Sequence, residues 1–187
     1  MHNNSIVLPT VLLSLKNFLV FSILFYLPLH FSNMGFSGFQ IGVLLSIFAI
    51  TSFASSFLAG LMSDRFPVRY LSSISFFLLM VYLISFSLTE NFWIILASFF
   101  IGGLGNNIAD ISLTSFVLKV TEKKDSGKRL GVFTTVKTLA SGLGALTGGL
   151  LLAHLAFKNV FLLLAALFFI TIVFTLLVRR RLKELEK

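Results

Sequence analysis

The sequence predicts an all-α membrane protein in which six transmembrane helices form one bundle. Three observations support this fold class: 57% of the 187 residues are hydrophobic, only 12% are charged, and the apolar residues gather into six long runs. A soluble domain of this length could not bury so much apolar surface, whereas a lipid bilayer is a natural solvent for it.

Each run has the length that a bilayer-spanning helix needs, about 20 apolar residues. We expect the spans at residues 9–30, 39–62, 70–88, 92–118, 131–155 and 160–178. The start of the chain does not fit a signal peptide, because residues 1–4 contain no lysine or arginine and the apolar run behind them is too long.

Composition excludes several classes of function. The chain has no cysteine, so it has no disulfide, thiol catalyst or thiolate metal site. The net charge of +8 does not indicate nucleic-acid binding, because the basic residues stand at the ends of apolar runs and not on a hydrophilic face. No spacing matches a zinc site, a nucleophilic triad or a phosphate loop, so we expect no catalytic residue, metal or cofactor and no enzymatic activity.

Basic residues predict the orientation, because cytoplasmic loops carry an excess of lysine and arginine. The loops and ends on one side hold Arg65, Arg69, Lys119, Lys123, Lys124, Lys128, Arg129, Arg179, Arg180, Arg181, Lys183 and Lys187. The opposite loops hold only Lys158, with the acidic Glu90 on the same side. We therefore expect both termini in the cytoplasm and the protein in the plasma or inner membrane.

One connection, at about residues 119–130, is long and hydrophilic. We expect it to be a cytoplasmic loop that divides three helices from three helices, with repeats at about 9–88 and 92–178. Four pairs recur 89 positions apart: Gly42 and Gly131, Gly60 and Gly149, Asn17 and Asn106, Arg69 and Lys158. Inverted three-helix repeats build transporter halves, but chance matches in glycine-rich apolar sequence would look the same.

Three ionisable side chains fall inside the expected spans: Lys16, Asp110 and Lys137. Charge inside a bilayer is costly and by default marks a functional site or a partner. Three interpretations stay open. Lys16 snorkels to the inner interface; Asp110 and Lys137 form a static ion pair; or Asp110 titrates or binds a cation or substrate, with a lysine tuning its pKa.

Helical spacing places further polar residues beside these charges. Those that recur at three- and four-residue intervals near Asp110 are Asn106, Asn107 and Thr114. Those on the face of Lys137 are Thr134, Thr138 and Ser141.

A short charged hinge, residues 60–71, separates the second and third expected spans. Its charges must lie at a membrane surface. Gly60 would let a neighbouring helix approach closely. Asp64 can accept hydrogen bonds from a helix N-terminus, and Arg65 and Arg69 can pair with carboxylates or lipid phosphates.

This hinge resembles the signature G-x-L-[AS]-D-R-x-G-[RK]-[RK] of the major facilitator superfamily, which lies between the second and third helices of its members. Gly60, Asp64, Arg65 and Arg69 match the signature, and Met62 and Ser63 are close to it. Pro67 replaces the turn glycine, which predicts a stiffer loop, and Val68 replaces a basic residue.

The resemblance implies the N-terminal six-helix half of a secondary transporter. Members have two six-helix bundles, bind substrate between them and work by alternating access. Their first and fourth helices line the cavity, so the resemblance implies that Asn17, Asn106, Asn107 and Asp110 face the substrate. The intramembrane charges Lys16 and Lys137 join them as expected cavity or coupling residues. Asp64 and Arg65 would gate the inner side.

Glycines in the fifth span resemble a second family motif, G-x(3)-G-P-x(2)-G-G of the proton-linked antiporters. Gly144, Gly148 and Gly149 match it, whereas Ala140 and Ala145 replace a glycine and the proline. Packing glycines are the simpler interpretation, because Gly144 and Gly148 form a seam that permits close helix crossing.

The resemblance accounts for half of such a transporter, and residues 179–187 form a basic tail similar to the start of its inter-bundle linker. A fragment, a split transporter and a homodimeric half-size protein are all open. We expect transport of a small solute within the lipid bilayer, with a second six-helix bundle as partner and proton coupling undecided. The alternative is a non-transporting membrane subunit or scaffold.

Overall fold

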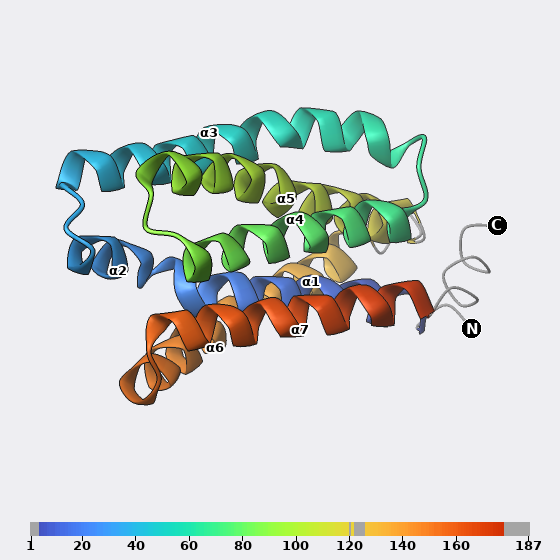
Figure 1. The fold of residues 1–187 in the computed structure, drawn as a ribbon. Helices are drawn as coiled ribbons and strands as arrows, with labels where there is room; N and C mark the ends of the chain where they lie inside the picture. Colours follow the sequence, from blue (N-terminus) through green and yellow to red (C-terminus); the bar gives the residue numbers. More distant parts are fainter. Residues whose placement is uncertain (1–3, 120, 122–125, 178–187) are drawn as a thin grey trace.

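Helices make up nearly all of the structure. The computed structural model describes residues 4–119, 121 and 126–177, which form α1 Asn4–Leu24, α2 Leu27–Asn33, α3 Gly38–Ser63, α4 Val68–Leu88, α5 Phe92–Lys119, α6 Ser126–His154 and α7 Phe157–Leu177 (Figure 1). By length and composition, six spans in this part of the chain could cross a membrane, and α1 and α2 together make the first, Val7–Asn33. The predicted all-α, six-helix bundle is confirmed. The predicted tail at 179–187 lies outside the described residues.

The first span is broken, although its sequence predicts one continuous helix. The backbone N–H of Tyr26 donates to the carbonyl oxygen of Ile23 at 2.8 Å in the turn between α1 and α2. Pro28 follows in the first turn of α2. In an unbroken helix the ring of Pro28 would collide with the carbonyl group of Leu24 and remove a backbone hydrogen bond, so the break falls just before it.

Polar side chains cap the starts of α3 and α5, which follow short connections. Ser37 and Gln40 form a reciprocal capping box at the start of α3. Gly35, with φ of +85°, supplies the left-handed backbone of the preceding turn. The side-chain oxygen of Asn91 accepts from the backbone N–H of Trp93 at 2.9 Å at the start of α5. Short turns therefore join α2 to α3 and α4 to α5.

The connections gather at two ends of the bundle (Figure 1). One end holds the turn between α3 and α4, the last turn of α5, and the first and last described residues. We call it the charged end, because Asp64, Arg65 and Lys119 lie there. The opposite end holds the connections at residues 34–37, 89–91 and 155–156.

The hydrophilic loop does not divide the chain as predicted. It joins α5, which ends at Lys119, to α6, which begins at Ser126. It therefore connects the fourth span to the fifth, and the prediction that it separates three helices from three helices is wrong. Residues 122–125 lie outside the described part of the chain. The third and fourth spans meet instead at the short turn of residues 89–91.

α5 is the central helix on one side of the bundle. It packs between α3 and α4, α7 packs on α4, and α1 packs mainly on α6. Small residues permit this close contact, because a Cβ atom at Gly103 would collide with Thr51 of α3 and one at Gly105 would lie 2.8 Å from the Cβ atom of Leu78 of α4. The hydroxyl of Ser52 donates to the carbonyl oxygen of Gly103 at 3.1 Å, which adds a polar bond between α3 and α5.

Aromatic side chains fill the core toward the opposite end. The rings of Phe31, Phe86 and Phe99 have centroids 5.5–5.7 Å apart, and Tyr82 lies 4.6 Å from Phe86 in an edge-on arrangement. Such offset and edge-on contacts stabilise a core beyond area burial. They fix α2, α4 and α5 against one another at this end.

Two spans are much less covered than the others. In the apolar 18-residue stretch of each span, the buried share is 11% for α6 and 28% for α3. It is 50% for the first and third spans. Large apolar side chains such as Phe53 and Phe57 of α3 and Leu146 and Leu150 of α6 are exposed. Within the described residues, nothing covers these two faces.

Candidate functional site

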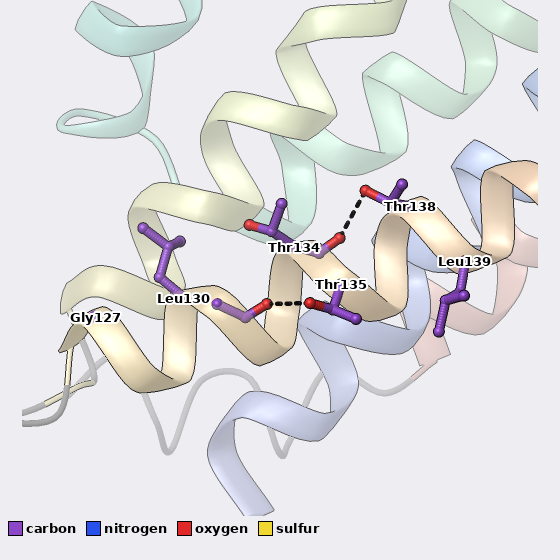
Figure 2. Close-up of a pocket in the computed structure, with 7 residues that line it drawn as sticks. Gly127, Leu130, Thr134, Thr135, Thr138 and Leu139 are labelled. Carbon is purple, nitrogen blue, oxygen red and sulfur yellow. Dashed lines mark hydrogen bonds between the residues drawn. The ribbon is translucent and has the colours of Figure 1, made fainter.

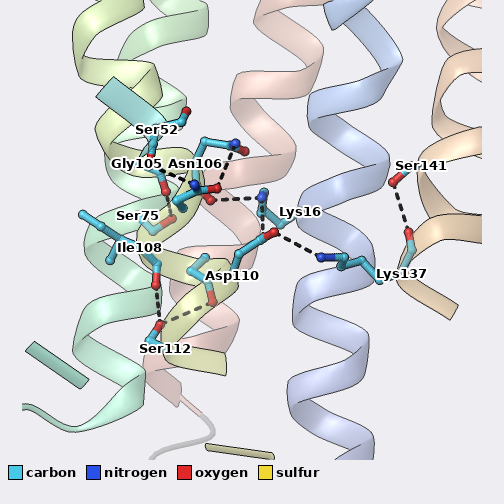
Figure 3. A network of polar contacts seen from close by, with 12 residues as sticks. Lys16, Ser52, Ser75, Gly105, Asn106, Ile108, Asp110, Ser112, Lys137 and Ser141 are labelled. Atoms are coloured by element: carbon cyan, nitrogen blue, oxygen red, sulfur yellow. Dashed lines mark hydrogen bonds and ion pairs between the residues drawn. The ribbon is translucent and has the colours of Figure 1, made fainter. Parts of the chain in front are cut away.

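The centre of the candidate site is the carboxylate of Asp110 on α5. The Nζ of Lys16 on α1 lies 2.6 Å from Oδ1, and the Nζ of Lys137 on α6 lies 3.3 Å from Oδ2 (Figure 3). Lys16 also donates to the backbone carbonyl oxygen of Asn106 at 3.0 Å. Three helices therefore meet at one carboxylate, and we call these three residues the charge triad.

The two lysines differ in how much of each side chain is exposed. The Lys16 side chain is 1% exposed, whereas those of Asp110 and Lys137 are 21% and 29% exposed. Lys16 therefore does not snorkel to a surface, and that interpretation is wrong: in the middle of α1, a carboxylate and a carbonyl oxygen solvate its ammonium. The contact between Asp110 and Lys137 suggested by the sequence is present, but the shorter contact belongs to Lys16.

The neighbouring asparagines differ in role. The Asn106 amide donates to the side-chain oxygen of Asn107 at 3.4 Å. The Asn107 amide in turn donates to the backbone oxygen of Ser52 and the hydroxyl of Ser56 on α3, both at 2.8 Å. Asn107 thus fastens α5 to α3 and is directed away from the triad. Asn17 is 3% exposed, and its Nδ2 has no hydrogen-bond partner among the described residues.

The face of α6 beside Lys137 borders an open hollow of about 650 Å³ (Figure 2). Its lining residues are Gly127, Leu130, Gly131, Thr134, Thr135, Thr138 and Leu139. The hydroxyls of Thr135 and Thr138 donate to backbone oxygens one turn earlier, each at 2.9 Å. These threonines therefore satisfy their own donors and leave a small, weakly polar surface.

At the charged end, Asp64 caps the C-terminus of α3 and pairs with a residue that sequence analysis did not connect to it. The Nζ of Lys119, at the end of α5, lies 2.9 Å from Oδ1 of Asp64 and donates to the backbone oxygen of Ser63 at 3.2 Å. Asp64 therefore accepts from a lysine and not from a helix N-terminus. Both side chains are exposed, at 56% for Lys119 and 73% for Asp64, so they are in contact with solvent.

The two hinge arginines are placed differently. Arg65 is exposed. Arg69 is 9% exposed, lies with its guanidinium 4.7 Å from the ring centre of Tyr70, and donates to that hydroxyl at 3.4 Å. No described carboxylate pairs with either arginine. Gly60 has no atom within 4 Å of a Cβ position, so nothing within the described chain uses its small size.

The glycines of the fifth span form a seam against α1. A Cβ atom at Gly144 would overlap the backbone oxygen of Phe18, and one at Gly148 would overlap that of Ser22. Gly149 lies against the hydroxyl of Tyr26, which donates to the backbone oxygen of Ala145 at 2.9 Å. These contacts hold α6, and with it Lys137, close to α1.

The triad can hold or release charge but lacks the parts of a metal centre. Among the described residues, no group of three His, Cys, Asp or Glu side chains could hold a metal ion. One carboxylate bridging two ammonium groups can instead exchange a partner for a proton or for a charged ligand. Such an exchange would alter the contacts among α1, α5 and α6 together.

The chain is similar in sequence to proteins whose names describe drug resistance. The chain is 24% identical over 123 residues to the quinolone resistance protein NorA of Staphylococcus aureus (strain MRSA252), a match that covers 66% of the chain and 32% of NorA. It is 29% identical over 162 residues to the multidrug resistance protein MdtG of Klebsiella pneumoniae (strain 342), covering 83% of the chain and 39% of MdtG. The chain thus spans well under half the length of these relatives.

Solved structures show the same fold. A POT family transporter in complex with 5-aminolevulinic acid superposes with a TM-score of 0.75 at 19% identity, over 95% of the chain and 38% of that protein. The sequence model of the Major Facilitator Superfamily matches residues 10–187. The six spans, the charged hinge and this match over nearly the whole chain lead to one conclusion: the chain is a multi-pass membrane protein that belongs to the Major Facilitator Superfamily.

Proposed function

We propose that the chain is one six-helix half of a secondary transporter that carries a small solute across the cell membrane by alternating access. The observation that carries this proposal is the charge triad in the interior of the bundle. Charged side chains within membrane spans are costly and are retained where they face a pathway or a partner. Asp110 and Lys137 keep partial exposure, which gives a solute or a proton access to the site.

The uncovered faces of α3 and α6 support a second six-helix bundle. Gly42 on α3 and Gly131 and Gly142 on α6 have open space around a Cβ position, unlike Gly144 and Gly148. Small residues on a membrane helix permit the close approach of another helix. A second bundle from the same polypeptide, a companion chain or a second copy would cover these faces and complete a cavity beside the triad.

The distribution of charge supports an orientation with both termini in the cytoplasm. The described basic residues toward the charged end are Arg65, Arg69, Lys119, Lys128 and Arg129, against Lys158 at the other end. An excess of lysine and arginine is typical of cytoplasmic loops. On this orientation the contact between Asp64 and Lys119 lies on the cytoplasmic side, where it would open and close as an inner gate.

Solute flux tests the proposal. The chain, with whatever partner co-purifies, would be reconstituted in liposomes, and uptake of a quinolone would be followed with and without a proton gradient, because one relative is a quinolone resistance protein. A panel of other small solutes follows the same protocol. We expect gradient-dependent flux that Asp110→Asn removes and that Glu90→Gln, at an exposed acid in an end turn, leaves intact. Absence of flux for every solute would favour the scaffold function.

A further inference from the structure

We propose that the charge triad binds the anionic group of the solute, a carboxylate or a phosphate, at the ammonium of Lys137. The inference rests on the proposed transport function and adds to it the chemical class of the ligand. Two lysines share the single carboxylate of Asp110, which leaves one positive charge without a counter-ion inside the bundle.

The unbalanced charge belongs to Lys137. Lys16 donates to Asp110 at 2.6 Å and to the carbonyl oxygen of Asn106 at 3.0 Å, so its buried ammonium is solvated by protein. Lys137 donates to Asp110 at the longer distance of 3.3 Å, and no other acceptor for it occurs among the described residues. An ammonium has three N–H donors, so two remain for a ligand. In Figure 3, Lys137 approaches Asp110 from the α6 side, and Asn106 lies on the other side of Asp110.

No second carboxylate of the described chain can neutralise Lys137. The acidic residues in that part are Asp64, Glu90 and Asp110. Asp64 is paired with Lys119 at the charged end, and Glu90 is exposed in a turn at the opposite end. The Lys137 side chain is 29% exposed within the membrane span, so an incoming anion would reach a charge without a second counter-ion and would find vacant donors there.

The same geometry disfavours a cationic ligand. A cation that approaches Asp110 would meet two ammonium groups already placed on its two oxygens. An anion at Lys137 makes a charge-assisted hydrogen bond without displacing Lys16. Lysine is a point charge with no planar fork, so the site does not by itself distinguish a carboxylate from a phosphate.

Thermal unfolding of the purified full chain in phosphatidylcholine nanodiscs tests this proposal. The probes are sodium benzoate, inorganic phosphate and, as a cation of similar size to benzoate, benzyltrimethylammonium, all at one ionic strength. A ligand that binds only the folded state raises Tm as its concentration exceeds Kd. We expect benzoate, phosphate or both to raise Tm by a few degrees and benzyltrimethylammonium to leave it unchanged.

Variants assign the effect to Lys137. Lys137→Met should abolish the anion-induced shift, whereas Lys137→Arg and Lys158→Met, at an exposed lysine at the start of α7, should keep it. Asp110→Asn should lower the anion concentration for half-maximal effect by about tenfold, because it removes the competing carboxylate. Lys137→Gln, which removes the charge but keeps a polar side chain, should also abolish the shift and tests the site even if Lys137→Met fails to fold. A shift that survives in Lys137→Met, or that only the cation produces, would overturn the anion site.

The outcome separates this proposal from the transport function. Lys137-dependent anion binding by a protein that supports no flux would refute transport alone. Flux that neither benzoate nor phosphate inhibits, and that Lys137→Met leaves unchanged, would refute the anion site alone.

Discussion

Neutralising Asp110 would leave the ammonium of Lys16 buried without a counter-ion. At the observed 2.6 Å, the gross attraction between the two charges is about 6 kcal/mol with an effective dielectric constant of about 20. Desolvation of both groups offsets most of this attraction in the intact pair. Removing one partner from a buried pair typically destabilises a protein by about 3–5 kcal/mol, and we expect a loss of that size for Asp110→Asn.

Replacing the other partner, Lys16, should lower the free energy of unfolding by less. Lys16→Met leaves Asp110 with Lys137 and with 21% exposure to solvent, so its cost should be about 1–3 kcal/mol, that of a hydrogen bond to a charged group. The double variant removes the attraction and the buried charge together. It should be within about 2 kcal/mol of the wild type, because an apolar replacement of a buried pair is often nearly neutral.

The free energy of unfolding would be measured in mixed micelles of dodecyl maltoside and sodium dodecyl sulfate, with helix content followed by circular dichroism. The coupling energy between Lys16 and Asp110 should exceed about 2 kcal/mol. The exposed pair of Asp64 and Lys119 provides the control cycle and should couple by less than about 1 kcal/mol. Additive effects of Lys16→Met and Asp110→Asn would refute the assignment of the triad as the link among α1, α5 and α6.

Three further predictions concern packing, gating and coupling. Gly148→Ala should destabilise the bundle by about 1–3 kcal/mol, because its Cβ atom would overlap the backbone of Ser22; Gly142→Ala on the same helix meets open space, and an equal loss there would contradict the seam. Asp64→Asn should abolish flux while changing the unfolding free energy by less than about 1 kcal/mol, since its partner Lys119 is exposed; normal flux would rule out the gate. Asp110→Asn should make any remaining flux independent of an imposed proton gradient, and an unchanged gradient dependence would leave Asp110 a packing role only.

The length of the apolar runs was enough to predict the six spans, because the thickness of the bilayer sets the length of each helix. The end of the second span was predicted at Met62 and lies at Ser63; the start of the fifth was predicted at Gly131 and lies at Ser126. That second difference arises because polar residues continue the helix beyond the apolar run. The break before Pro28 was not predicted, although proline disrupts a helix interior. Pro9 lies within α1, so a proline alone does not mark a break.

The partners of the charges could not be predicted, because they depend on which helices are neighbours and how each is rotated. Asp64 and Lys119 lie 55 residues apart, and only the packing of α5 on α3 brings them together. Asn106 and Asn107 are adjacent in sequence, yet one helical step directs the Asn107 amide to α3. Lys16 was recognised as intramembrane, but its pairing with Asp110 required knowledge of how α1 lies against α5.

The mass of the intact complex tests the central claim, that this chain is one half of a two-bundle transporter. The tagged protein would be purified from its native membrane in mild detergent and weighed by native mass spectrometry. Our account predicts a species that contains a second six-helix bundle, as a longer polypeptide, a companion chain or a second copy. A lone bundle of 20.7 kDa, with the faces of α3 and α6 still uncovered, would contradict it.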